Sequence, residues 1–181
     1  MKQILFFACF LLLISFAFAQ TDSTKALAVG DKAPDFSLEY ATKDSVASDD
    51  ISLSSLVGKR NIVLAFYPAD WSGGCTKEVC SLRDNFTLLS NLDAEILAIS
   101  GDSPYTHKEW ANHHGLPFKL LSDHKHSVSK TYASFNDESG YNKRTVYVIN
   151  KQGNIAYMDM RYSVRDSVSF GHLQDALKQL Q

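Results

Sequence analysis

Residues 66–80 read FYPADWSGGCTKEVC, at the junction between a predicted buried strand and a predicted helix. The apolar run 62–66 is typical of a strand buried on both faces of a mostly parallel sheet. A proline and a pair of glycines then break the run. From Val79 onward, apolar residues recur at intervals of three and four and predict a helix over about 75–91. The stretch therefore joins a central strand to a crossover helix.

A second apolar run, 95–99, completes a strand–helix–strand unit and predicts a neighbouring central strand. Downstream, the pattern predicts further helices and a β-hairpin that turns at residues 150–153. In chain order these elements are a helix over 106–114, a helix over 125–132, hairpin strands over 145–149 and 155–160, and a helix over 173–180. Together the elements predict an α/β protein of thioredoxin-like fold, with a central mixed β-sheet flanked by helices on both faces.

Composition and charge limit the classes of function that the protein can have. The 181 residues are 45% hydrophobic and 21% charged, which is ordinary for a globular chain with one domain. The 18 Lys and Arg residues are balanced by 20 Asp and Glu residues and are spread along the chain, so no basic stripe is available to bind a phosphate backbone. Nucleic acid is therefore not an expected partner.

The N-terminus has the pattern of a secretory signal. Lys2 precedes an apolar run over 4–18, and small residues follow where a signal peptidase cleaves. The run is shorter than the roughly 20 apolar residues of a membrane-spanning helix. We expect residues 1–19 to be a signal peptide, 20–28 a flexible leader and 29–181 the folded domain. The mature protein would be periplasmic or secreted, without membrane attachment.

Cleavage would remove Cys9 and leave Cys75 and Cys80, which are a disulfide candidate in an exported protein. Cys75 falls in the first turn of the predicted helix, where backbone N–H groups and the helix dipole favour a thiolate. In a helix the two Cα atoms would be about 8–9 Å apart, whereas a disulfide needs them within about 7 Å. Either the helix unwinds to form the bond, or the pair is a permanent disulfide in a loop.

The order of Pro68, Ser72, Cys75 and Glu78 in this loop resembles the active-site signature of the peroxiredoxins, which are thiol peroxidases of thioredoxin-like fold. A second cysteine five residues after the first, Cys80, is similar to the peroxiredoxin Q group, also called bacterioferritin comigratory proteins. The loop sequence PADWS, residues 68–72, is more similar to the corresponding loop of a related one-cysteine bacterial branch. The resemblance extends from about residue 29 to 157 and includes the segments 29–36, 116–123 and 144–149.

The resemblance implies a role for each of these residues. Cys75 would be the peroxidatic cysteine, which attacks hydrogen peroxide or an alkyl hydroperoxide, and Cys80 the resolving cysteine, which forms an intramolecular disulfide. Pro68, Ser72 and Arg144 fill the positions that shape the peroxide pocket. A thioredoxin-like dithiol protein would be the reductant, and no metal, flavin or haem cofactor is implied.

Elementary chemistry supports these roles. The guanidinium of Arg144 has a permanent charge and fixed N–H donors, which can hold a thiolate and stabilise charge as the O–O bond breaks. Glu78, one helical turn after Cys75, would by itself disfavour the thiolate, so we expect an ion pair between Glu78 and Arg144. Arg161 and Arg165 are competing cations, and only the resemblance selects Arg144.

Two positions depart from the family pattern. Ser72 stands where the family most often has Thr, which keeps the hydroxyl and loses a methyl group. Gly73 and Gly74 make the loop more flexible, so we expect easier local unwinding. Tyr67 and Trp71, beside the buried strand, are candidates to line the peroxide pocket, but aromatic residues in such positions are more often core residues, and we interpret both as core.

Two other functions remain open. An exported thiol:disulfide oxidoreductase of the same fold would also use a cysteine pair, although its usual Cys-x-x-Cys spacing is shorter than the spacing of Cys75 and Cys80. A non-catalytic binding domain stabilised by a fixed disulfide is the third possibility. The sequence leaves open whether the protein is a monomer or a homodimer, and which peroxide it prefers.

Overall fold

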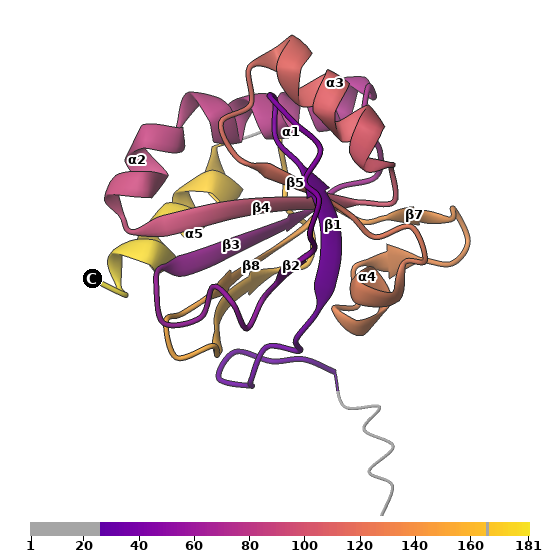
Figure 1. Cartoon of the computed structure of the whole chain (residues 1–181). Helices are drawn as coiled ribbons and strands as arrows, with labels where there is room; N and C mark the ends of the chain where they lie inside the picture. The colour runs from indigo at the N-terminus through magenta and orange to yellow at the C-terminus, as the bar shows by residue number, and fades with distance from the viewer. Residues whose placement is uncertain (1–25, 166) are drawn as a thin grey trace, which may run out of the picture.

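The computed structural model describes residues 26–165 and 167–181 (Figure 1). The predicted signal peptide, 1–19, and most of the predicted leader, 20–28, lie outside the described residues. Within them, seven strands form one sheet in the order β2-β1-β5-β4-β3-β8-β9, and β6 and β7 form a small hairpin. The strands are β1 (Ser37–Ala41), β2 (Ile51–Ser52), β3 (Asn61–Phe66), β4 (Ala94–Ser100), β5 (Lys119–Ser122), β6 (Phe135–Asn136), β7 (Tyr141–Asn142), β8 (Thr145–Ile149) and β9 (Ile155–Asp159). The helices are α1 (Gly73–Asp84), α2 (Phe86–Asn91), α3 (Pro104–His114), α4 (Ser127–Thr131) and α5 (Val168–Lys178).

The centre of the sheet is the predicted strand–helix–strand unit. β3 and β4 pair in parallel, from Asn61 opposite Ala94 to Phe66 opposite Ile99. β5 continues the parallel part on the far side of β4, and the other pairs in the sheet are antiparallel. Every residue of β3 is buried, as its continuous apolar run predicts. The prediction of a mixed sheet is therefore confirmed.

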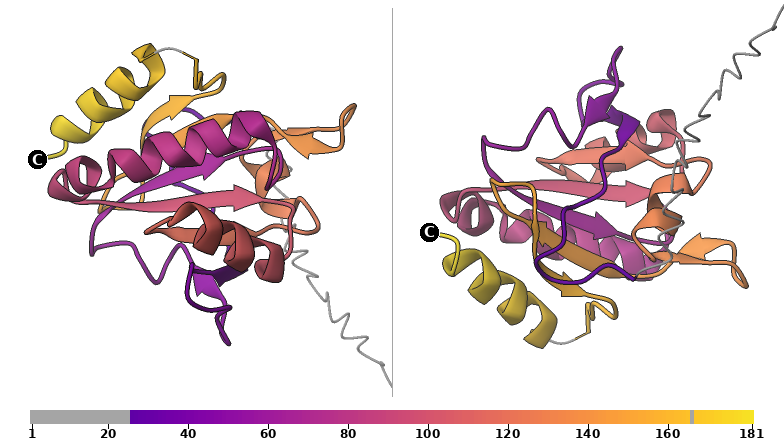
Figure 2. Two further views of the ribbon diagram at one scale, coloured as in Figure 1. Left: turned by 90° about the horizontal axis from the view of Figure 1, so that it is seen from above. Right: turned by 90° about the horizontal axis from the view of Figure 1, so that it is seen from below.

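Side chains alternate along β3 between two apolar cores, one on each face of the sheet. Val63 and Ala65 point to the core that α1, α3 and α5 cover, where Trp110 of α3 is fully buried. Ile62 and Leu64 point to the core that α4 and the N-terminal segment cover. Seen from above, α1 lies between α5 and α3 (Figure 2, left). The predicted thioredoxin-like arrangement, with helices on both faces, is confirmed.

The single helix predicted over 75–91 is wrong in one respect, because the chain forms two helices that meet at Asn85. Asn85 has φ −103° and ψ 10°, outside the helical values. Its side-chain amide donates to the carbonyl oxygen of Ser81 at 2.9 Å, and its own carbonyl oxygen accepts from the N–H of Leu89 at 3.0 Å. This local hydrogen bonding ends α1 and starts α2.

The sequence patterns also missed β1, β2, β5 and the hairpin β6–β7. β5 is a short strand without a long apolar run, yet it lies between β1 and β4 in the sheet. β1 alternates between exposed and buried residues because it pairs near the edge, with β5 on one side and the two-residue β2 on the other.

Candidate active site

The loop after β3 enters α1 through Ser72, which is the residue that caps the helix. The Oγ atom of Ser72 accepts from the backbone N–H of Cys75 at 3.4 Å, and the hydroxyl of Thr76 donates to the carbonyl oxygen of Ser72 at 3.0 Å. This cap leaves the hydroxyl hydrogen of Ser72 free to donate. Cys75 is fully buried in the first helical turn, where the helix N-terminus favours negative charge on sulfur.

Arg144 is the cation that reaches this cysteine. Its Nη2 atom donates to the Sγ of Cys75 at 3.4 Å. The antiparallel pairing of Phe66 with Thr145 brings the start of β8 beside the end of β3 and so places Arg144 next to the loop. The two competing cations, Arg161 and Arg165, are exposed side chains farther along the chain.

Glu78 lies one helical turn after Cys75 and is buried. Arg144 donates from Nη1 to Oε2 of Glu78, so the ion pair expected from the sequence is present. The other oxygen, Oε1, has no hydrogen-bond partner among the described residues. Burial raises the pKa of Glu78 to about 7, against the charge and hydrogen bond of Arg144, which lower it. Burial also lowers the pKa of Arg144, but the charges of Glu78 and Cys75 outweigh that effect and the net pKa is raised.

The raised pKa of Glu78 predicts a pH dependence of stability. Because the usual pKa is 4.5 and the folded value is about 7, folding takes up a proton between these values. This carboxyl group therefore makes the protein less stable as pH rises from 4.5 through about 7. In chemical denaturation at several pH values, Glu78→Gln is expected to remove this downward slope of the free energy of unfolding. Parallel pH curves for wild type and variant would contradict the prediction.

Gly74 is required for the close approach of Arg144. A Cβ atom at this position would lie 2.6 Å from Nη2 of Arg144, whereas a Cβ atom at Gly73 would meet nothing within 4 Å. Both glycines are in the first turn of α1, so alanine at either position stabilises the helix by about 0.5–1 kcal/mol.

The two glycines form a matched pair of variants. Gly74→Ala is expected to push the guanidinium away from Cys75 and slow the reaction of this thiol with peroxide by about tenfold. Gly73→Ala has the same helix effect and is expected to keep the wild-type rate. Stopped-flow measurement of the two variants checks the prediction, and equal rates for both would refute it.

Cys80 is half-buried on the same helix as Cys75, and both are free thiols. Helix geometry separates their Cα atoms by about 8–9 Å, beyond the reach of a disulfide. The pair lies in a helix rather than in a permanently non-helical loop. Pro68 is half-buried in the loop between β3 and α1.

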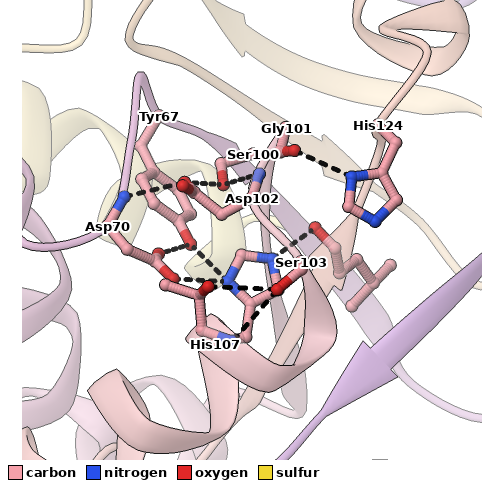
Figure 3. Close-up of polar contacts among 10 residues, drawn as sticks. Tyr67, Asp70, Ser100, Gly101, Asp102, Ser103, His107 and His124 are labelled. Atoms are coloured by element: carbon pink, nitrogen blue, oxygen red, sulfur yellow. Dashed lines mark hydrogen bonds and ion pairs between the residues drawn. The ribbon is translucent and has the colours of Figure 1, made fainter.

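A buried polar cluster behind the loop was not predicted from the sequence. Asp70 of the loop accepts from the hydroxyl of Tyr67 at 2.7 Å and lies 2.9 Å from Nδ1 of His107 on α3. The other ring nitrogen of His107 lies 3.2 Å from the carbonyl oxygen of Leu121 in β5. Figure 3 shows the side chains of Asp70, Tyr67 and His107 pointing toward one another. Neither Asp70 nor His107 exposes its side chain to solvent.

The interpretation of Tyr67 as a core residue is confirmed, whereas that of Trp71 is wrong. Tyr67 is fully buried against Trp110, with ring centroids 5.5 Å apart. Trp71 is 53% exposed, because its φ of 59° turns the side chain away from the core and toward His113 and His114 on α3.

Residues 26–165 and 167–181 contain no group of three or more His, Cys, Asp or Glu side chains placed to hold a metal ion. In the same part of the chain, no helix combines the length and apolar character needed to cross a membrane.

Comparison with known proteins identifies the family. A family model described as the AhpC/TSA family matches residues 29–158, which include the cysteine loop, α1 and Arg144. The chain belongs to this peroxiredoxin family. Two relatives of this peroxiredoxin are alkyl hydroperoxide reductase E of Mycobacterium tuberculosis and peroxiredoxin Bcp of Bacillus subtilis. The first is 37% identical over 144 residues, covering 77% of this chain and 91% of the relative. The second is 33% identical over 158 residues, covering 84% and 94%.

Solved structures agree with this assignment. The crystal structure of peroxidoxin BcpB from Mycobacterium tuberculosis matches with a TM-score of 0.75 and 25% sequence identity, over 86% of this chain and 99% of that chain. The protein is thus an enzyme of the peroxiredoxin type, a thiol-dependent peroxidase. The alternative of a thiol:disulfide oxidoreductase is not favoured.

Proposed function

We propose that this peroxiredoxin reduces hydrogen peroxide or an alkyl hydroperoxide at Cys75 and completes its cycle through a disulfide with Cys80. The observation that carries the proposal is the contact of 3.4 Å between Nη2 of Arg144 and Sγ of Cys75 in a buried first helical turn. A permanent cation and a helix N-terminus at one sulfur favour the thiolate, which is the nucleophilic form.

In the first step the Cys75 thiolate attacks one peroxide oxygen. An S–O bond forms as the O–O bond breaks, and the sulfur loses two electrons to become a sulfenic acid. The departing oxygen takes up a proton and leaves as water or an alcohol. The contact of Arg144 with Cys75 and the free hydroxyl hydrogen of Ser72 support a role for both residues in stabilising the charge that develops on the peroxide oxygens.

In the second step the thiol of Cys80 condenses with the sulfenic acid. An S–S bond forms and one water molecule leaves. Because α1 holds the two Cα atoms about 8–9 Å apart, the first turns of the helix must unwind, and the glycines at 73 and 74 make this easier. A thioredoxin-like dithiol protein then reduces the disulfide to two thiols and becomes a disulfide itself.

Mass spectrometry after one equivalent of hydrogen peroxide tests this cycle. The wild-type protein is expected to lose two hydrogen atoms, as a disulfide between Cys75 and Cys80 requires. Cys80→Ser is expected to gain one oxygen atom and to react with a sulfenic-acid trap. A wild-type protein that gains oxygen and forms no internal disulfide would show that Cys80 does not resolve the sulfenic acid and that the cycle requires an external thiol.

Export is a second part of the proposal. The N-terminal pattern over residues 1–19 supports cleavage by a signal peptidase, and peroxide reduction would then take place in the periplasm or outside the cell. N-terminal sequencing of the protein from cell fractions tests this. A mature N-terminus at Gln20 in an exported fraction supports export, and an intact Met1 in the cytoplasm overturns it.

A further inference from the structure

The cysteine loop, residues 67–72, connects β3 to α1. It is held in place at Asp70, through both the backbone and the side chain of this residue. The backbone N–H of Asp70 donates to Oδ2 of Asp102 at 2.8 Å, and Ser100 donates to the same oxygen at 2.7 Å. The side chain accepts from Tyr67 and pairs with His107. These contacts tie the loop to the end of β4, the turn after it and α3 (Figure 3).

The polar side chains of Asp70, Tyr67 and His107 contact one another or the backbone of Leu121, so the cluster has no free group to offer a substrate. Both ring nitrogens of His107 lie within hydrogen-bond distance of oxygen atoms, one on Asp70 and the other on the backbone of Leu121. The hydroxyl of Tyr67 already donates to Asp70. A buried, internally satisfied group of this kind positions its neighbours rather than transferring protons to a ligand.

The next residue, Trp71, has the properties of a hinge. Its φ of 59° lies in the left-handed region, which is unfavourable for a bulky side chain and persists only where the surroundings hold it. The surroundings are the anchored Asp70 on one side and the rings of His113 and His114 on the other. A change of backbone conformation at Trp71 would release this strain.

We propose that Asp70, His107 and Tyr67 form a positioning group that fixes the first part of the loop between β3 and α1, up to Asp70. The group stops the unwinding of α1 from spreading back past Asp70. While the group is intact, Pro68 and Ser72 keep their places around Cys75. When α1 unwinds for disulfide formation, the loop opens from Trp71 onward and the pocket re-forms on the same support. This inference rests on the proposed cycle through Cys80.

The test uses rapid mixing of the reduced protein with hydrogen peroxide, which separates oxidation of Cys75 from disulfide formation. Asp70→Ala is expected to lower the rate constant of Cys75 oxidation by at least about tenfold. The rate constant of disulfide formation is expected to stay at the wild-type value or to rise, because the helix is less restrained. The ratio of the rate constant of disulfide formation to the rate constant of Cys75 oxidation therefore rises. A loss of stability alone would not raise this ratio.

Two variants accompany this one. Asp70→Asn is expected to restore most of the oxidation rate, since its amide can still accept from Tyr67 and can donate to Nδ1 of a neutral His107. Asp123→Ala removes a carboxylate that is also buried but binds the N–H of Ser129 at the start of α4, at 2.7 Å. This control is expected to lower the melting temperature and leave the ratio of rate constants unchanged.

If Asp70→Ala does not fold, Tyr67→Phe carries the test, because it removes one donor to Asp70 and keeps the ring packed on Trp110. It is expected to raise the same ratio by a smaller factor. Oxidation within about twofold of the wild-type rate in the variant measured, or equal slowing of both steps, would overturn the inference. If the wild-type protein forms no internal disulfide, the role of Cys80 fails, and the oxidation rate alone decides on the positioning group.

Discussion

Cys75→Ser is expected to abolish peroxide consumption by the reduced protein. The hydroxyl of serine is a far weaker nucleophile than a thiolate, and neither Arg144 nor the helix N-terminus can ionise it at neutral pH. Any residual consumption is expected to match that of an ordinary thiol, because Cys80 would be the one cysteine left in a protein prepared from Gln20 onward. Stopped-flow mixing with hydrogen peroxide measures the loss directly.

Cys80→Ser is the matched control for this variant. It is expected to keep the rate of the first attack, because Cys80 lies on the same helix but outside the contact between Arg144 and Cys75. Its sulfenic acid then has no internal partner and is oxidised further to the sulfinic acid when peroxide is in excess. Equal rates of peroxide consumption by wild type and Cys75→Ser would remove Cys75 from the reaction.

Arg144→Lys is expected to slow the attack on peroxide by about 10²–10³-fold. The guanidinium contacts Glu78 through one nitrogen and Cys75 through another. Lysine keeps the charge, but its single ammonium group cannot contact both residues at once in the same fixed orientation. The effect is therefore on orientation rather than on net charge.

Arg165→Lys makes the same chemical change at an exposed side chain and is expected to react like the wild type. Circular dichroism of both variants separates slow chemistry from loss of structure. If Arg144→Lys keeps a rate within about tenfold of the wild type, the contact between Arg144 and Cys75 does not carry the rate enhancement.

Much of the fold could be predicted because its central elements have strong local patterns. β3 and β4 are continuous apolar runs, and the predicted periodicity of α1 places Val79 and Leu82 in the core. β5 and the break at Asn85 were missed for a physical reason. A short strand and a helix interruption depend on tertiary pairing and on single side-chain hydrogen bonds, which periodicity does not detect.

The chemistry of the site could be predicted only in part from the sequence. The position of Cys75 in the first helical turn follows from local signals at a strand–loop–helix junction, whereas the cap at Ser72 was not predicted. The partners of these residues come from distant parts of the chain. Arg144 was selected among three arginines by family resemblance alone, and no local signal indicated that Asp70 pairs with His107, 37 residues away.

The most direct test of the central claim is rapid mixing of the fully reduced protein, prepared from Gln20 onward, with one equivalent of hydrogen peroxide. Free thiols and tryptophan fluorescence are followed together, since Trp71 lies in the cysteine loop and Trp110 packs behind it. The account predicts that both thiols are lost much faster than free cysteine reacts, with a fluorescence change as α1 unwinds. Thiols that oxidise no faster than free cysteine would contradict it.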